Sequence, residues 1–301
     1  MKKRESKTPM KVSGFTFIRN GEILGYPFVE SIKSILPIVD EFVVNVGRSD
    51  DDTLLRIQEI GDPKIRIIQS EWNENVRNDY SIGGFVYGQQ KSIALFNTTG
   101  DWAFYLEGDE IVHQDDLNNI HETMEKYRDN DEVEALHFDY LHFYGNKNTY
   151  LSSPGWYRTA PRIIKNNIPV WAPKGLYFVV MQDYKGGRYP KALPSGGTIY
   201  HYGYVRNEKQ MQLKFDKVEK YWSNNKKEFH YGNIDPTILT EFKGTHPKIV
   251  ENYFPEVDGV FQSDPNYIPT KKEIKRRWKG RLEKLLGGID LSRKFYLKAK
   301  V

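Results

Sequence analysis

The segment Trp102-Ala-Phe-Tyr-Leu-Glu-Gly-Asp-Glu-Ile111 combines a short run of large apolar residues with three acidic residues. A continuous apolar run of this length predicts a central strand, buried on both faces of a parallel sheet. Ligands of open α/β sheets bind at the carboxyl ends of strands, where Glu107, Asp109 and Glu110 stand. Clustered carboxylates repel one another unless a cation neutralises them. The segment therefore predicts either a metal site or an acidic turn that caps the next helix.

The spacing within this segment favours a shared ligand. Glu107 and Asp109 are two residues apart, so both side chains point to the same side of an extended backbone. Gly108 between them lets the chain turn or a ligand approach closely. The chain has no cysteine, so a bound metal is held by oxygen or imidazole nitrogen. Such ligands suit Mg²⁺ or Mn²⁺, which take further ligands from phosphate and water.

Strands and helices alternate around this segment. Apolar runs alternate with stretches whose apolar residues recur every three or four positions. The predicted strands are residues 12–18, 41–46, 64–69 and 102–106, and the predicted helices are residues 27–36, 54–60, 84–97 and 117–127. This alternation predicts an α/β fold with a mostly parallel, mixed sheet flanked by helices.

The pattern changes near Glu134. Residues 136–140 alternate apolar and polar side chains, as in a half-buried strand of a mixed sheet. Residues 145–203 are rich in glycine, proline and aromatic residues and show few helical periods. Helices are predicted again at 208–221 and 271–286. The second half is therefore expected to be irregular and to close over the edge of the first.

The composition is that of a globular chain. Of its 301 residues, 39% are hydrophobic and 28% are charged, which excludes an intrinsically disordered chain. No apolar run approaches the roughly 20 residues of a membrane-spanning helix. Residues 1–10 are basic and polar without an apolar segment behind them, so we expect a cytoplasmic protein. The motif GxxxxGK followed by Ser or Thr is absent, which excludes P-loop chemistry.

Basic residues concentrate near the C-terminus, although the net charge is only +4. The pairs and triplets Lys271-Lys272 and Lys275-Arg276-Arg277 begin this region. The favoured interpretation is a solvated face of a terminal helix. The alternative is peripheral contact with an anionic membrane, to which each basic residue contributes about 1 kcal/mol. Nucleic acid is not an expected partner.

The order of these landmarks resembles that of family 2 glycosyltransferases and their relatives with the GT-A fold. The first strand ends in a polar turn, Phe17-Ile-Arg-Asn-Gly21, and the second runs into the acidic stretch Asn45-Val-Gly-Arg-Ser-Asp-Asp-Asp-Thr53. Glu107-Gly-Asp109 follows a hydrophobic strand, as the DxD motif of the family does, with Glu in the first position. The likeness covers residues 11–116 well and the remainder in outline.

The resemblance implies a metal-dependent, hexosyltransferase-like enzyme that uses Mn²⁺ or Mg²⁺. It would move a sugar from a UDP- or GDP-sugar to a glycan or lipid-linked acceptor, with inversion, as in polysaccharide biosynthesis. Residues 11–206 would form the catalytic domain, with a nucleotide-sugar half at 11–116 and an acceptor half at 117–206. Residues 207–301 would form a helical, basic extension.

The resemblance also assigns roles near the metal. Asp109 becomes a metal ligand, and Glu107 contacts the donor. Many GT-A enzymes supply a late histidine as a further ligand, and His201, between two tyrosines on an apolar strand, fits that role. Without the resemblance, a core histidine is the ordinary interpretation. Arg206 follows closely enough to bind a phosphate.

Further donor contacts are implied in the first half. Asn20 lies in the polar turn after the first strand, and Asn45 would contact the base. Gln90 and Lys91 occupy the helix before the metal strand, with Lys91 facing phosphate or simply solvated. Residues 50–52 are interpreted first as a helix cap.

Inversion needs a carboxylate that deprotonates the acceptor hydroxyl. Asp139 and Asp183 are the candidates in the acceptor half, and Asp183 is favoured because it follows the apolar run 176–181. Arg162 would bind acceptor or phosphate, or lie on the surface.

The sequence leaves two alternative functions to consider, a nucleotidyltransferase and a non-catalytic sugar-binding protein. A nucleotidyltransferase would need a glycine-rich basic loop after the first strand, but Arg19-Asn-Gly-Glu22 suits a triphosphate poorly. A non-catalytic sugar-binding protein on the same fold would show no metal requirement and no donor hydrolysis.

Overall fold

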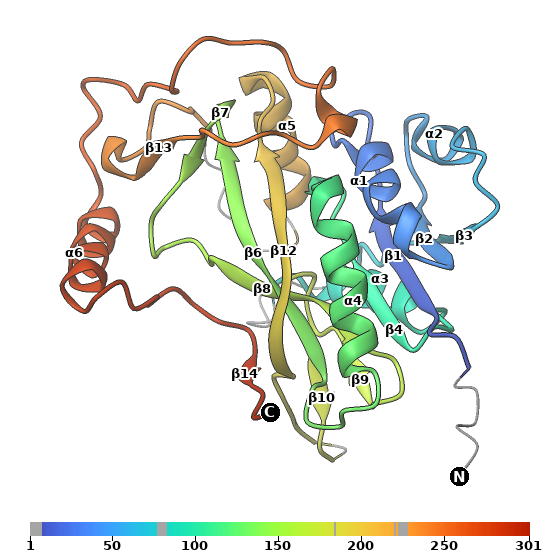
Figure 1. The fold of residues 1–301 in the computed structure, drawn as a ribbon. Coiled ribbons are helices and arrows are strands. Elements are labelled where there is room, and N and C mark those ends of the chain that lie inside the picture. Colours follow the sequence, from blue (N-terminus) through green and yellow to red (C-terminus); the bar gives the residue numbers. More distant parts are fainter. Residues whose placement is uncertain (1–7, 77–82, 184, 220, 222–227) are drawn as a thin grey trace.

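A computed structural model of the chain describes residues 8–76, 83–183, 185–219, 221 and 228–301. Within these residues the strands form one sheet of eleven strands and one of three (Figure 1). The helices are α1 (Phe28–Ile35), α2 (Thr53–Gln58), α3 (Phe85–Leu95), α4 (Leu117–Tyr127), α5 (Glu208–Glu219) and α6 (Lys271–Leu285). The strands are β1 (Val12–Ile18), β2 (Glu41–Gly47), β3 (Ile65–Ser70), β4 (Trp102–Tyr105), β5 (Glu110–Val112), β6 (Ala135–Tyr144), β7 (Asn146–Leu151), β8 (Thr159–Lys165), β9 (Val170–Trp171), β10 (Val179–Met181), β11 (Gly187–Arg188), β12 (Lys191–Tyr204), β13 (Leu239–Glu241) and β14 (Leu297–Lys298).

The first half is a parallel sheet with crossover helices. Its strands are ordered β3-β2-β1-β4, and each neighbouring pair is parallel. Helices α1, α2 and α3 connect consecutive strands, as parallel pairing requires. The predicted α/β fold, with a mixed sheet flanked by helices, is confirmed. The predicted ends of these four strands agree with the observed ends to within a residue.

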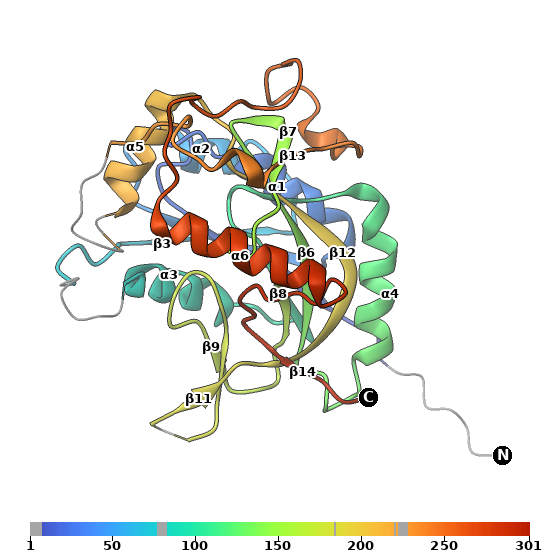
Figure 2. The same ribbon diagram turned by 90° about the vertical axis from the view of Figure 1, so that its left-hand side faces the viewer.

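Side chains of the central strands alternate between two apolar layers. Phe15 on β1 and Tyr105 on β4 pack with Leu95 of α3 on one side. Phe104 packs with Ile32 of α1, and with α4, on the other side. Figure 2 shows α3 and α4 on opposite sides of the sheet. Because both faces are covered, the strand before the acidic segment is fully buried, as its apolar run predicts.

The sheet becomes antiparallel beyond β4. Strand β8 pairs antiparallel with both β4 and β6, and β12 runs parallel to β6. The short β5 pairs antiparallel with β12 and sets Glu110 opposite His201. The sequence predicts an apolar strand around His201 but not the full length of β12, because Pro194, Gly196 and Gly197 interrupt the pattern. The strand shifts register between Pro194 and Thr198.

The described residues beyond 206 (207–219, 221 and 228–301) wrap around the edge of the main sheet (Figure 1). They contribute α5 and α6, but also β13, which pairs with β7, and β14, which pairs with β12. The domain boundary at residue 206 stays a prediction. In the part of the chain that the structure describes, no helix has the length and apolar composition that crossing a membrane requires.

Two helical glycines differ in the space around them. A Cβ at Gly88 in α3 would lie 2.4 Å from the backbone carbon of Pro173, whereas one at Gly280 in α6 would lie 3.6 Å from Pro154. Gly88→Ala should lower the free energy of unfolding by about 1–3 kcal/mol through overpacking. Gly280→Ala should raise it by up to about 1 kcal/mol through helix propensity. Melting curves of both variants test this, and equal shifts would contradict it.

Candidate functional site

A cavity of about 440 Å³ opens at the carboxyl ends of β1 and β4. Its walls come from the ends of these strands, from α3, from the segment after β4, from β6 and β12, and from α5. Among the sequence-predicted site residues, those that line it are Asn20, Glu107, Asp109 and His201. The cavity lies at the strand edge where α/β sheets bind ligands.

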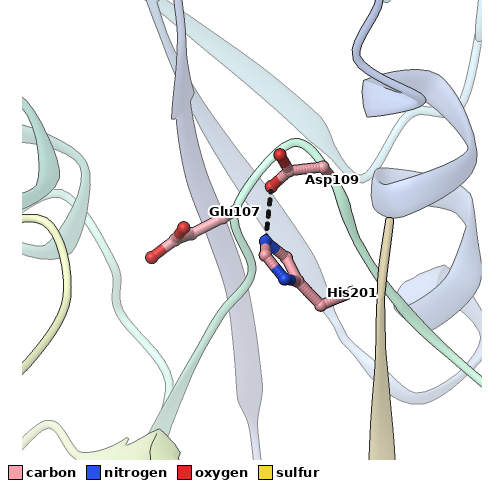
Figure 3. Close-up of side chains that lie close together, drawn as sticks. All are labelled: Glu107, Asp109 and His201. Carbon is pink, nitrogen blue, oxygen red and sulfur yellow. Dashed lines mark ion pairs between the residues drawn. The ribbon is translucent and has the colours of Figure 1, made fainter. Parts of the chain in front are cut away.

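Two acidic residues and one histidine meet in this cavity. Glu107 and Asp109 lie on the turn between β4 and β5, and the backbone N–H of Tyr202 donates to the carbonyl of Asp109 at 2.8 Å. This bond, with the pairing of β5 and β12, brings His201 beside the turn. His201 Nε2 lies 3.6 Å from Asp109 Oδ1. Figure 3 shows this ion pair as a dashed line, with Glu107 beside it. One donor atom from each of the three residues lies within 4.8 Å of the others.

Asp109 is a buried carboxylate surrounded by cations. Lys214 Nζ on α5 lies 3.0 Å from Asp109 Oδ2, and Arg206 Nη2 lies 3.6 Å from the same oxygen. Burial alone would raise the pKa of Asp109. The charges of Lys214 and His201 outweigh burial and hold that pKa well below its usual range. Burial lowers the pKa of Lys214 to about 8, although Asp109 opposes the shift.

The pKa of Glu107 is raised, whereas that of Asp109 is lowered. Burial and the neighbouring charge of Glu110 raise the pKa of Glu107 to about 7. Glu110 forms an ion pair with Arg162, with Nη2 to Oε1 at 2.6 Å and Nε to Oε2 at 2.8 Å, and both side chains are fully buried. Burial would raise the pKa of Glu110, but Arg162 lowers it below its ordinary value. Glu107 thus shares a weaker contact with Arg162, at 3.3 Å.

A second histidine fixes the orientation of the first. His142 Nε2 lies 2.7 Å from the carbonyl oxygen of Tyr157, which only accepts, so Nε2 carries the proton. Burial, together with His201, lowers the pKa of His142 to about 3, so the ring is neutral and its Nδ1 is an acceptor. His142 Nδ1 is 2.9 Å from His201 Nδ1, which therefore donates. This contact fixes the proton on Nδ1 of His201 and leaves its Nε2 free to hold either a second proton or a metal ion beside Asp109.

The chemistry of the donor set fits a hard divalent cation. Two carboxylates and an oriented imidazole, without sulfur, are ligands that Mn²⁺ and Mg²⁺ accept. His201 Nε2 lies 3.6 Å from a carboxylate oxygen of Asp109, so a proton or a metal ion on Nε2 would be stabilised by that carboxylate. A metal-bound histidine ordinarily donates its other N–H to a neighbouring group, as His201 donates to His142.

Aromatic rings form the wall beyond the acidic turn. Trp72 contacts Tyr87 and Tyr221 edge-on, at ring centroid separations of 5.2 and 5.6 Å. The Arg19 guanidinium lies 5.6 Å from the Trp72 ring. Trp72 Nε1 is buried and has no hydrogen-bond partner among the described residues. A flat ring with acceptor groups would suit this wall, because it could stack on the aromatics and accept from the indole N–H.

Asn20 is held at the rim of the cavity. Its backbone is left-handed, with φ of 56°, and its Oδ1 accepts from the backbone N–H of Asp50 at 2.8 Å. Asp50 also lines the cavity. Asp52 is the N-cap residue of α2 but its side chain makes no cap bond. Asp51 accepts from the backbone N–H of Thr53 at 3.1 Å instead.

Three other predicted donor contacts lie outside the cavity lining. Asn45 faces α3, where its Nδ2 donates to Gln90 Oε1 at 2.9 Å, and both side chains are buried. Lys91 is fully buried, and its Nζ donates to the carbonyl of Gly175 at 2.9 Å. Its ammonium lies 3.7 Å from the Tyr105 ring centroid. Lys91 therefore holds α3 to the segment before β10, is shielded from solvent and does not line the cavity.

The remaining predicted residues do not line the cavity either. Asp183 is exposed in the turn between β10 and β11, where its Oδ1 accepts from the backbone N–H of Gly186 at 2.8 Å. Asp139 is exposed on β6. Arg206 lies behind the wall, 4.8 Å from the Tyr26 ring. Its Nε and Nη2 atoms are buried without hydrogen-bond partners in the described part of the chain.

The sequence interpretation missed the contribution of α5. Lys214, Lys217 and Val218 of α5 line the cavity, as does Tyr221, which follows the helix. In the predicted helix 208–221 their spacing of three, four and seven residues puts them on one face. That spacing is a signal in the sequence. Two lysines and a tyrosine on one face of a helix do not form an apolar face that packs against a core, so their clustering indicates a binding face. His142 carried no comparable signal.

Comparisons with known proteins give partial matches. No family model matches the sequence, and no curated protein does. The solved structure of S. aureus TarS matches at 16% identity over 74% of this chain and 42% of its own, with a TM-score of 0.39. TarS 1–349 in complex with UDP-GlcNAc matches at 16% identity over 52% of this chain and 46% of its own, with a TM-score of 0.35.

A further match is glucosyl-3-phosphoglycerate synthase from Mycobacterium tuberculosis, in complex with Mn²⁺, UDP and phosphoglyceric acid. It shares 20% identity over 44% of this chain and 43% of its own, with a TM-score of 0.31. The chain spans less than half the length of these solved structures. The likeness is partial, and the function is argued below from the side chains of the cavity.

The buried pair of Arg162 and Glu110 generates a stability prediction. Arg162→Met should lower the free energy of unfolding by about 3–5 kcal/mol, because it leaves Glu110 as a buried charge without its partner. Adding Glu110→Gln removes that charge and keeps an oxygen that accepts from Tyr140, so the double variant should recover much of the loss. Chemical denaturation measures both. A single variant as stable as the unmodified chain would contradict the ion-pair assignment.

Proposed function

We propose that this protein is a metal-dependent glycosyltransferase with a GT-A fold, which moves a sugar from a nucleoside diphosphate sugar to an acceptor. The observation that carries the proposal is the meeting of Glu107, Asp109 and His201 at the carboxyl ends of β1 and β4. The cavity that holds them also contains an aromatic wall and two lysines. A base, a diphosphate and a sugar would each have side chains of suitable chemistry in this cavity.

The cation would be held by Asp109, His201 and Glu107. When bound there, a divalent cation supplies neutralisation of the charge that develops on the departing nucleoside diphosphate. Lys214 and Lys217 point into the same cavity from α5 and would bind the phosphates as point charges. Both lysines come from one helix, so α5 positions two cations for one ligand.

The aromatic wall would hold the nucleobase. Trp72, Tyr87 and Tyr221 offer ring faces and edges on which a base can stack. Asn20 and Asp50 lie nearby and would contact the ribose or the base by hydrogen bonds. We propose UDP- or GDP-sugars as donors, as the sequence resemblance implies.

The acceptor would enter from the opposite wall. Trp156, Tyr157 and Tyr204 line the cavity on the side of His142. Aromatic faces of this kind pack against the apolar face of a sugar ring, so a glycan or lipid-linked glycan suits the site. Inversion of the sugar stays a prediction, which the anomeric configuration of the product tests. Asp139 and Asp183 are outside the cavity lining, so the proposal assigns the deprotonation of the acceptor to neither residue.

The donor can be identified by thermal stabilisation. A ligand that binds only the native state raises the melting temperature by mass action. We expect one class of nucleotide sugars to stabilise the protein with Mn²⁺ present and to lose most of that effect with a chelator. A non-catalytic sugar-binding protein would show stabilisation without a metal requirement and without release of nucleoside diphosphate.

Asp109→Asn tests the metal assignment directly. The carboxamide keeps the shape but removes the charge, so Mn²⁺-dependent release of nucleoside diphosphate should fall by roughly 100-fold or more. Asp183→Asn is the matched control, because it makes the same change on an exposed turn, and it should retain activity. Circular dichroism checks that both variants are folded. Normal turnover by Asp109→Asn, or an equal loss in Asp183→Asn, would overturn the assignment.

His142 is predicted to act as a positioning residue for His201. His142→Leu removes the acceptor for the Nδ1–H of His201, and Mn²⁺ affinity should fall by about 10- to 100-fold. His142→Gln keeps an acceptor for His201 and a donor for the Tyr157 carbonyl, so it should bind Mn²⁺ nearly as well as the unmodified protein. Calorimetric titration with Mn²⁺ in the presence of nucleoside diphosphate measures both. Equal affinities for the two variants would show that His142 only fills space.

A further inference from the structure

Helix α6 presents a row of large apolar side chains to solvent. Ile274, Trp278, Leu282 and Leu285 are spaced by four, four and three residues, so they lie on one side of the helix. Their exposed fractions are 43%, 63%, 47% and 83%. We call these four residues the apolar stripe. A contiguous exposed apolar row of this kind marks an interaction surface.

The opposite side of α6 is fixed to the rest of the protein. Arg277 pairs with the buried Asp235 at 2.7 Å, and the buried Glu283 pairs with Arg158 at 2.9 Å. A capping box at Thr270 sets the first turn of the helix. These contacts hold the stripe outward, because turning it inward would break both ion pairs. Figure 1 shows α6 at the outer edge of the molecule, and Figure 2 shows it crossing the near face.

Positive charge surrounds the apolar stripe. The two acidic residues of α6, Glu273 and Glu283, bond to Thr270 and to Arg158 and leave no acid on the outer side. The Arg281 guanidinium lies 4.9 Å from the Trp278 ring. The exposed basic residues of the helix are Lys271, Lys272, Lys275, Lys279, Arg281 and Lys284.

We propose that the apolar stripe of α6 inserts into the headgroup layer of an anionic membrane, with the surrounding lysines and arginines on lipid phosphates. A helix with Trp, Ile and Leu on one face and basic residues beside them is the kind that lies in a membrane interface. The charge pattern selects anionic lipid as the occupant. A second copy of α6 would set two basic surfaces against each other, which like-charge repulsion opposes.

A second, smaller cavity lies between α6 and residues that line the larger cavity. This smaller cavity, of about 190 Å³, is lined by Glu273 and Arg276 of α6 and by Trp156 and Tyr204. Trp156 and Tyr204 also line the larger cavity. A glycan anchored in the lipid surface would approach the acidic turn past these two shared residues. This step rests on the proposed transferase activity, whereas the docking of α6 does not.

Vesicle sedimentation tests the role of the stripe. The full chain should bind vesicles of phosphatidylcholine mixed with phosphatidylglycerol, should not bind pure phosphatidylcholine, and should be released by salt. Replacing Ile274, Trp278 and Leu285 together by Ser should weaken binding by about tenfold or more. Phe96→Ser is the control, because Phe96 is 67% exposed at the end of α3, far from α6 in sequence. It should bind as the unmodified chain does.

A charge variant tests the lipid partner separately. Replacing Lys272, Lys275 and Lys279 by Gln should lower the partition coefficient by roughly 100-fold, since each basic residue near the surface contributes about fivefold. The control replaces three exposed lysines elsewhere in the chain and should bind normally. These are Lys33, Lys126 and Lys243.

Three outcomes would overturn the proposal. They are no binding of the full chain to the mixed vesicles, unchanged binding by the stripe variant, or a dimer of the full chain that the stripe variant loses. Circular dichroism and Mn²⁺-dependent stabilisation by a nucleotide sugar are measured on the same samples. They separate a loss of docking from misfolding and from a failure of the proposed function.

Discussion

Three carboxylates within four residues, at the buried end of β4, are the constraint on which the rest of the structure depends. A buried charge is costly unless it is paired and hydrogen-bonded. The cost of burial is offset in a different way for each of the three carboxylates. Arg162 from β8 neutralises Glu110, and Lys214 from α5 neutralises Asp109. Burial and the charge of Glu110 raise the pKa of Glu107 to about 7, so its charge is the one most easily given up.

The irregular second half of the chain is organised by this constraint. Strand β8 must lie antiparallel to β4 to bring Arg162 beneath the acidic turn. Strand β12 must pair with β5 to bring His201 beside Asp109. Helix α5 must cover the cavity so that Lys214 reaches the same carboxylate. The second half therefore supplies counter-charges and ligands to a turn that the first half builds.

The first half could be predicted from the sequence because its signals are local. Apolar runs and three- and four-residue spacings gave β1 to β4 and α1 to α4, since each strand is buried by the helices next to it in the chain. The surroundings of residues such as Asn45 and Lys91 were harder to predict. Periodicity shows which face of an element is buried, but not which other element packs against that face. Asn45 is covered by α3, and Lys91 of α3 is covered by the segment around Gly175.

The second half could be predicted only in outline, because its contacts are distant in sequence. Only the part of β12 around His201 was predicted, since Pro194 and the two glycines at 196 and 197 break the two-residue alternation before it. The nearness of His201 to Asp109 was expected from the resemblance, not from any pattern in the residues themselves. The lysines of α5 show a helical spacing in the sequence. Only the structure shows that this face of α5 lines the cavity.

The pairing of Asp109 with residues so far along the chain also orders events during synthesis. A nascent chain that has emerged as far as residue 190 contains the acidic turn, Arg162 and the first four strands, but neither His201 nor Lys214. Asp109 then has no counter-charge from the chain, so the end of β4 stays solvated rather than buried. The cavity closes only after β12 and α5 leave the ribosome. Its formation requires loops of roughly 100 residues to close, and contacts of this separation are slow to form.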